Sequence, residues 1–256
     1  MGQLILGTYD SDEYFIVTTD NILEPLGVQV IGDTRYDLTP QTKDNVDNIA
    51  GMHGELDFGT SYGTRALELH VAIDEGQTPL QKHQLQREMA AYLDPTKGYK
   101  KLIFMDDPDV MYEVKYSGKI SFEHKPTWFD FVIPFKVKPF IMSYVEHSLA
   151  GTGSIVNAGT FECPIYIEIP GPATSPSISV GATVIAYGSA VAAGQSLVIK
   201  CGTEFGYQTA YISAITSVNA MPNITGDIDY MLPPGISVTV IPSISVTSVK
   251  WNDKWI

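Results

Sequence analysis

The sequence predicts a mainly β protein with two parts: an N-terminal β-sandwich-like domain carrying one packed α-helix, and a C-terminal β-sandwich. Short segments of alternating apolar and polar residues recur along the chain, and only one stretch has helical periodicity. Charge also falls abruptly. Residues 1–147 hold 13 Lys and Arg and 23 Asp and Glu, whereas residues 148–256 hold 3 and 6. The linker-like composition of Ser148–Ser154 therefore divides the chain into domains 1–147 and 148–256.

Strands dominate the expected N-terminal domain. The clearest is Arg65–Ile73, in which Leu67, Leu69, Val71 and Ile73 form a core-facing stripe. Asp33–Asn48 is polar and turn-rich and is expected to be an exposed loop, while Ile49–Gly59 is glycine-bearing and leads toward that strand. The other expected strands lie at residues 14–19, 28–31, 101–105, 111–116 and 128–138.

A single helix is expected at Pro79–Leu93. Leu85, Met89, Tyr92 and Leu93 recur at spacings that place them on one face of a helix, with polar residues elsewhere around it. Proline fits the first helical position, and Pro95 prevents the helix from continuing beyond Asp94. The domain is therefore predicted to pack this helix on a β core.

The second domain begins with Asn157–Gly171, read as a turn followed by a strand. In that strand Ile165, Ile167 and Ile169 point inward, and Tyr166 and Glu168 point outward. Pro164 cannot donate to a sheet ladder, so we place it at the start of the strand. Further strands are expected at residues 177–180, 183–187, 196–200, 207–212, 235–241 and 243–251.

Composition excludes several function classes. The net charge of −13 argues against binding nucleic acid through phosphate contacts, which needs a basic face. No apolar run is long enough to span a bilayer, and the N-terminus lacks the positive residues of a secretory signal, so no membrane contact is expected. Cys163 and Cys201 are too few for a disulfide framework and are expected to be reduced and buried.

Catalytic and metal-binding motifs are not found. The five histidines never pair at metal-ligand spacing, and the Asp106–Asp109 cluster is explained by a turn between two strands. No nucleophile elbow or Cys-His signature occurs. We therefore expect no enzyme activity, no catalytic residue, no metal and no cofactor.

The order of features along nearly the whole chain resembles the distal tail proteins of long, flexible-tailed bacteriophages and prophages. The resemblance rests on Ile49–Gly54 and its glycine-bearing turn, the strand at Leu67–Ile73, and the helix ending at Leu93. It continues through Val156–Gly171 and Leu232–Gly235 to the C-terminal Trp251 and Trp255.

Two positions depart from the family pattern. Met52 stands where the family often has Arg, and Lys200-Cys201-Gly202 stands where an Asp is common. No detail of contacts at those positions is carried over.

The resemblance implies that the C-terminal sandwich is galectin-like and that the N-terminal domains form a homo-hexameric ring around a channel. Such a ring would join the tail-tube protein to tail-tip or receptor-binding proteins in the virion, after assembly in the host cytoplasm. DNA would pass without specific binding, and the net charge of −10 in the first domain fits such a conduit.

Two surfaces are candidate binding sites. Glycine-rich hairpins suit pairing between subunits, so Ile49, Met52, His53, Leu56 and Phe58 are the expected ring contacts, although an ordinary hairpin within one subunit explains the pattern equally well. The alternative function is a carbohydrate-binding module that attaches the particle to the host cell wall. It requires exposed aromatic residues, and the candidates are first Tyr187, Phe205, Tyr207 and Tyr230, with Tyr166 and Tyr211 also considered, although packing in the core explains most of them.

Overall fold

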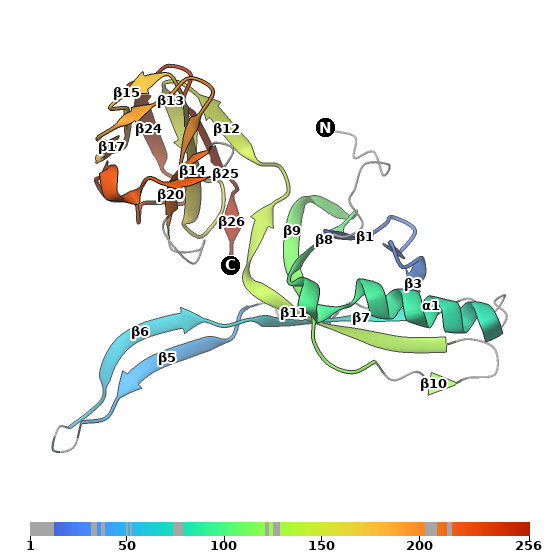
Figure 1. The fold of residues 1–256 in the computed structure, drawn as a ribbon. Helices are drawn as coiled ribbons and strands as arrows, with labels where there is room; N and C mark the ends of the chain where they lie inside the picture. Colours follow the sequence, from blue (N-terminus) through green and yellow to red (C-terminus); the bar gives the residue numbers. More distant parts are fainter. Residues whose placement is uncertain are drawn as a thin grey trace. The chain divides into compact units, whose positions relative to one another are not determined.

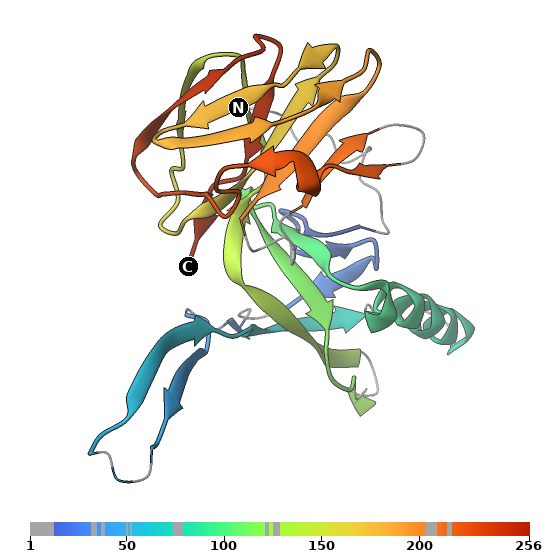
Figure 2. The same ribbon diagram turned by 60° about the vertical axis from the view of Figure 1, so that its left-hand side comes forward.

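The chain forms two compact units in a computed structural model (Figures 1 and 2), and each is described by itself. The first unit is Met1–Ile141 with Ile256, and the second is Met142–Trp255. The division lies between residues 141 and 142, whereas the drop in charge along the sequence lies near residue 148. The structure describes residues 13–31, 35–36, 39–49, 51, 53–73, 79–120, 123–124, 129–202, 209–213 and 217–256.

The N-terminal unit is a β domain with one α-helix, α1 (Pro79–Tyr92), followed by a 3₁₀ turn at Pro95–Lys97. The helix ends at Tyr92, one residue before the predicted Leu93, because Pro95 prevents its continuation. The strands of the unit are β1 (Tyr14–Val17), β2 (Ile22–Glu24), β3 (Val28–Val30), β4 (Arg35–Tyr36), β5 (Thr42–Asp47), β6 (Leu56–Tyr62), β7 (Arg65–Ile73), β8 (Lys100–Phe104), β9 (Asp107–Tyr116), β10 (Glu123–His124) and β11 (Phe129–Ser143).

The main sheet of this unit closes on itself. Its strands follow the order β11-β9-β8-β1-β2-β3-β7, and β7 also pairs with β11. That closing pair is long and antiparallel, with its register running from Phe129 opposite Ile73 to Val137 opposite Arg65. The sequence predicts a sandwich-like arrangement of these strands. The strands instead form one sheet that closes into a barrel. Closure removes the free edges that an open sheet leaves.

The core of the barrel comes from the inward faces of these strands. The stripe predicted on β7 is confirmed, since Leu67, Leu69 and Val71 are all buried, and alternate residues of β11 face them across the register. On α1, Met89 and Leu93 at its C-terminal end are buried in the same cluster, with Leu85 and Tyr92 packed at its border. Apolar residues that repeat every 3.6 positions in the helix and every second position in the strands thus meet in one core.

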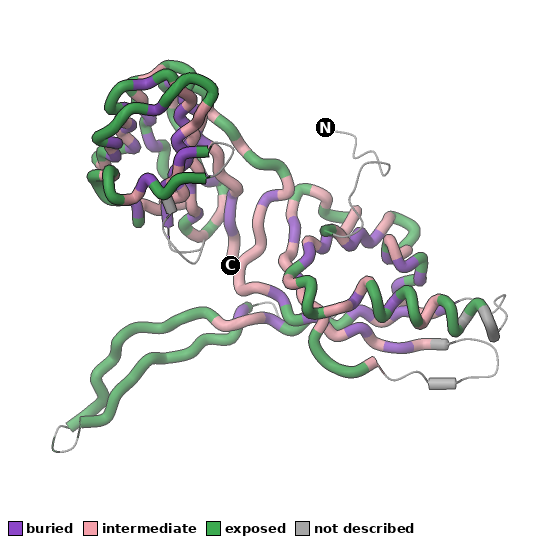
Figure 3. Tube along the Cα trace, viewed as in Figure 1, coloured by how far each residue is buried: buried purple, intermediate pink, exposed green. Residues whose placement is uncertain are grey.

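Strands β5 and β6 form a separate two-stranded sheet, which we call the arm. Every residue of both strands is exposed, and Figure 3 shows the arm in the colour of exposed residues along its described length. The prediction that Asp33–Asn48 is a loop is wrong, because β4 and β5 lie within it. The sequence of β5, TKDNVD, has only one apolar residue and so lacks the alternation that marks a half-buried strand.

The C-terminal unit contains only strands and a single 3₁₀ turn among its described residues. Its strands after the end of β11 are β12 (His147–Ala150), β13 (Gly153–Val156), β14 (Cys163–Pro170), β15 (Ala173–Thr174), β16 (Ser177–Val180), β17 (Thr183–Tyr187), β18 (Ala190–Val191), β19 (Ser196–Cys201), β20 (Thr209–Ser213), β21 (Val218–Asn219), β22 (Ile224–Thr225), β23 (Met231–Leu232), β24 (Ser237–Pro242), β25 (Ser248–Trp251) and β26 (Lys254–Trp255). The 3₁₀ turn is Met221–Asn223.

Two sheets of this unit enclose its core. One has the order β12-β25-β14-β19-β20-β21, with β23 also paired to β14, and the other has the order β13-β24-β16-β17-β22. Residues from both sheets meet in one buried cluster, including Ile167, Ile199, Val180 and Val240. The unit is therefore a β-sandwich, as expected.

The strand β14 alternates strictly between buried and half-buried residues. Ile165, Ile167 and Ile169 are at most 1% exposed, which confirms the orientation predicted from the sequence. The turn before it is organised by Asn157, whose side-chain oxygen accepts a hydrogen bond from the Gly159 amide at 2.9 Å. The Asn157 side chain also donates to the Phe161 carbonyl at 2.7 Å, so this buried amide holds the turn at residues 157–161 that precedes β14.

Candidate assembly surface

The arm is a twisted hairpin with one extra residue in β6. Its register joins Thr42 to Tyr62 and Asp44 to Thr60, then resumes at Val46 opposite Asp57. Three residue steps in β6 therefore oppose two steps in β5, which is a β-bulge at Phe58-Gly59. Gly59 has a φ of 92°, a conformation that favours glycine. Bulges of this kind twist a strand and discourage indiscriminate pairing of its free edge.

Side chains of the arm itself hold the bulge. Asp57 accepts a hydrogen bond from the Gly59 amide at 2.8 Å, and the Asn45 amide donates to the Gly59 carbonyl at 3.2 Å. Across the strands, the Thr60 hydroxyl donates to Asp44 at 2.7 Å. These contacts explain why polar residues crowd this segment, since they satisfy backbone groups that no second layer covers.

The arm exposes several apolar side chains. Phe58 is 69% exposed, Val46 is 45% exposed and Leu56 is 36% exposed, and Ile49 in the connecting turn is 48% exposed. Fully burying one such side chain contributes about 1.5–3 kcal/mol. A group of them left in water between residues 46 and 58 is a feature of surfaces that bind another molecule.

The base of the arm is anchored to the N-terminal unit. The buried Arg65 donates from Nε to the Pro139 carbonyl at 2.9 Å, and Tyr62 packs edge-on against Phe140 with ring centroids 5.8 Å apart. The Gly63 amide donates to the Gln41 carbonyl at 2.6 Å, which closes the two ends of the hairpin. Its attachment is thus fixed, while its strands remain exposed.

The structure brings together most of the ring contacts proposed from the sequence. Leu56 and Phe58 lie in β6, Ile49 and His53 lie in the segment that connects β5 to β6, and all four are exposed; Met52 lies outside the described residues. Sequence reasoning missed β5 and with it Val46. β5 has no apolar periodicity. The signal that could have revealed it is its run of hydrogen-bonding residues just before a glycine-bearing segment with which it can pair as a hairpin.

The aromatic residues proposed to bind glycan are placed differently. Tyr187 is a core residue, 6% exposed, so it is not available to a ligand, and Tyr230 packs against the same core, where burial raises its pKa. Phe205 and Tyr207 lie outside the described residues. Tyr166 and Tyr211 face outward, but they contact one another. Burial is the main cause that raises the pKa of Tyr166 to about 12, and the neighbouring Tyr211 adds to it. The described aromatic candidates thus offer no unoccupied stacking platform.

Groups with catalytic potential are sparse in the described part of the chain. No cluster of His, Cys, Asp or Glu there has the arrangement of a metal site. Both cysteines are buried, and burial raises the pKa of Cys201 to about 12, so its thiol stays protonated at neutral pH. None of the helices in the described residues is both long and apolar enough to cross a membrane.

Comparison with known proteins identifies the N-terminal unit. Residues 11–137 match the family described as the phage tail protein RIFT-related domain. This range covers the closed sheet, the arm and α1. No curated protein matches the chain by sequence.

Among solved structures, the crystal structure of the SPP1 Dit protein is similar to this chain with a TM-score of 0.67 and 14% identity, over 90% of this chain and 94% of that one. That protein is described as a paradigm of the hub adsorption apparatus in phages that infect Gram-positive bacteria. A chain of the phage P2 baseplate has a TM-score of 0.47 and 13% identity, over 88% of this chain and 91% of that one. The chain therefore carries a phage tail protein RIFT-related domain at residues 11–137 and has the fold of the SPP1 Dit protein.

Proposed function

We propose that this protein is the hub at the tail tip, a homo-hexameric ring that joins the tail tube to tail-tip or receptor-binding proteins. The observation that carries the proposal is the arm, whose two strands are exposed along their whole length and carry apolar side chains. A hairpin in this state is suited to contact a second molecule. The tail-protein family match and the fold shared with SPP1 Dit support the same role.

The arm has the properties that a ring contact requires. Within the described residues of the N-terminal unit, the main sheet is closed, whereas β5 and β6 pair only with each other and leave their outer edges free. A contact between the arm of one subunit and a different surface of the next is heterologous, and heterologous contacts close into a ring when their rotation is right. Main-chain pairing or side-chain docking can both supply the affinity.

The charge of the first domain supports a channel role. Its net charge of −10 disfavours stable phosphate contacts, so DNA would pass through the ring without being held. In this proposal the C-terminal sandwich is the platform for the tail-tip partners. The protein acts by assembly in the virion, formed in the host cytoplasm, and not by catalysis.

The test is the oligomeric state of the purified protein, measured by light scattering and by negative-stain imaging. We expect six copies in a ring with a central hole, alone or together with the tail-tube protein. A protein that remains monomeric and also fails to bind both the tail-tube and tail-tip proteins of its phage would contradict the proposal.

A further inference from the structure

A buried acid, Asp253, lies at the centre of a hydrogen-bond network in the C-terminal unit. The residue is 6% exposed, and both oxygens of its carboxylate are engaged. Oδ1 accepts from the Ala158 amide at 2.9 Å, in the turn that precedes β14. Oδ2 lies 2.9 Å from Nε2 of His147 in β12, and the imidazole donates because a carboxylate can only accept. One carboxylate thus joins two segments that are distant along the chain, and both bonds offset the cost of burying its charge.

The backbone of Asp253 holds the first residues of the same unit. Its amide donates to Oγ of Ser143 at 3.0 Å, and its carbonyl accepts from the Ser143 amide at 2.8 Å. Beside it, Nδ2 of Asn252 donates to the Ser143 carbonyl at 2.9 Å. The segment Met142–His147, with which the C-terminal unit begins, is therefore fastened to residues 252–253 at two points, Ser143 and His147.

Apolar burial contributes little to the attachment of this segment. Ser143 is its one buried residue, and Val145 is 59% exposed. The side chain of His147 is 41% exposed and stacks on Trp251 with ring centroids 5.4 Å apart, whereas the side chain of Asp253 is 8% exposed. A segment held by few buried apolar contacts opens locally at a lower free energy than the whole unit. The hydrogen bonds to Asp253 are therefore what keeps the segment in place.

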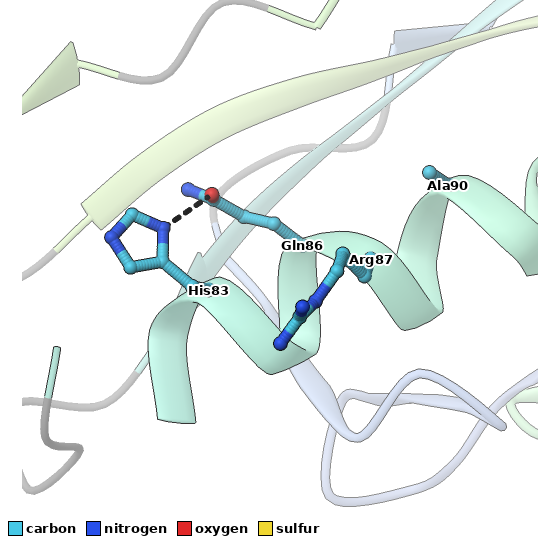
Figure 4. A pocket seen from close by; sticks show the side chains of 4 residues that line it. All are labelled: His83, Gln86, Arg87 and Ala90. Atoms are coloured by element: carbon cyan, nitrogen blue, oxygen red, sulfur yellow. Dashed lines mark hydrogen bonds between the residues drawn. The ribbon is translucent and has the colours of Figure 1, made fainter. Parts of the chain in front are cut away.

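The histidine on α1 has the opposite surroundings. Figure 4 shows His83 turned toward Gln86, with Nδ1 and Oε1 3.4 Å apart, beside a hollow of about 520 Å³ that Arg87 and Ala90 also line. None of these four residues is buried, so the pair links two neighbouring turns of one helix at the surface. His147 differs because its partner is a buried acid 106 positions further along the chain.

We propose that Asp253 is a latch that fastens the segment Met142–His147 to the C-terminal sandwich, and that its opening frees this segment while the sandwich stays folded. The sandwich does not depend on the latch, because its two sheets are held by their own apolar cluster. Met142 directly follows Ile141, at which the long stretch of the N-terminal unit ends. The latch thus decides whether the connection between the two units is fixed or flexible. This inference does not depend on the proposed ring.

Amide hydrogen exchange of the full chain, followed by mass spectrometry of its peptides, tests the latch. In Asp253→Ala, peptides that cover residues 142–147 and residues 157–161 should both exchange about tenfold faster or more, because the loss of a buried charged acceptor releases both segments. Peptides that cover β14 should keep their exchange rate, since the apolar cluster holds that strand. The matched control is Asp229→Ala, which removes an exposed acid of the same unit and should change none of the three.

A second variant, His147→Phe, opens the latch from its exposed side. It keeps an aromatic ring on Trp251 and removes the donor to Asp253, so residues 142–147 should exchange faster while residues 157–161 stay near the wild-type rate. If Asp253→Ala does not fold, His147→Phe alone decides. An unchanged rate at residues 142–147 in His147→Phe overturns the inference. So does an equal acceleration of residues 142–147 and β14 in either variant, because Asp253 would then support only the fold as a whole.

Discussion

Strands β6 and β14 are similar in length but differ in their pairing and in their surroundings. Strand β14 has antiparallel neighbours on both edges, β19 and β25, and its residues alternate between buried and half-buried. Strand β6 pairs only with β5, and all of its residues are exposed. Both carry large apolar side chains, such as Ile167 in β14 and Phe58 in β6.

The difference teaches that a large apolar side chain stabilises the fold in one strand and remains free to bind another surface in the other. Ile167 is surrounded by the two sheets of the sandwich, so its burial stabilises the C-terminal unit. Phe58 has no second layer behind it and contributes little to the isolated chain. Its free energy of burial is available only when another surface covers it.

The largest expected effect is at the centre of β14. Ile167→Ala should lower the free energy of unfolding of the C-terminal unit by about 2–5 kcal/mol, because it removes buried methyl groups and leaves a cavity. Urea denaturation followed by tryptophan fluorescence, to which Trp251 and Trp255 of this unit contribute, measures it. The matched control is Val184→Ala, which changes a side chain that is 55% exposed in the same unit and should shift stability by no more than about 0.5 kcal/mol. Equal effects of the two variants would contradict the distinction.

A smaller effect is expected at the turn that precedes β14. Asn157→Ala removes a buried side chain that accepts from the Gly159 amide and donates to the Phe161 carbonyl. The loss should be about 1–3 kcal/mol, since half-buried backbone groups are left without partners. The same denaturation experiment measures it, with the exposed Asn223→Ala as a control. An unchanged midpoint would show that water replaces the lost hydrogen bonds without cost.

The smallest effect on stability is expected in the arm. Phe58→Ser should change the free energy of unfolding by no more than about 0.5 kcal/mol, because the ring is already in water. Thermal unfolding of the dilute monomer measures this, and light scattering at higher concentration should show weaker assembly. A large loss of stability in the monomer would mean that Phe58 packs on its own chain, and the contrast with β14 would fail.

Much of the fold could be predicted from the sequence, for a specific physical reason. Strands such as β7 and β14 are half-buried, so alternation of apolar and polar residues records which face meets the core. The helix α1 is similarly marked by Met89 and Leu93 on one face and by the proline that ends it. An element with one buried face has apolar residues at regular spacing, and this spacing can be recognised in the sequence.

The arm and the candidate glycan contacts could be predicted only in part. Leu56 and Phe58 were found because a glycine-rich hairpin precedes β7, whereas β5 was read as a loop because its polar residues serve the bulge and not a core. Tyr187 was a candidate glycan contact, yet it lies in the core on the same face of β17 as Ile185. The opposite face carries the exposed Val184, so both faces of this strand are apolar and alternation does not separate them.

By itself the sequence determined the local elements, the positions of the core residues and the unequal distribution of charge. These follow from propensity, from period and from composition, each of which is a property of neighbouring residues. The tertiary structure alone decided that β7 pairs with β11 to close the sheet and that β5 and β6 stand away from it uncovered. Those outcomes depend on pairing between distant strands and on which surfaces are left without a second layer, and no local pattern records either.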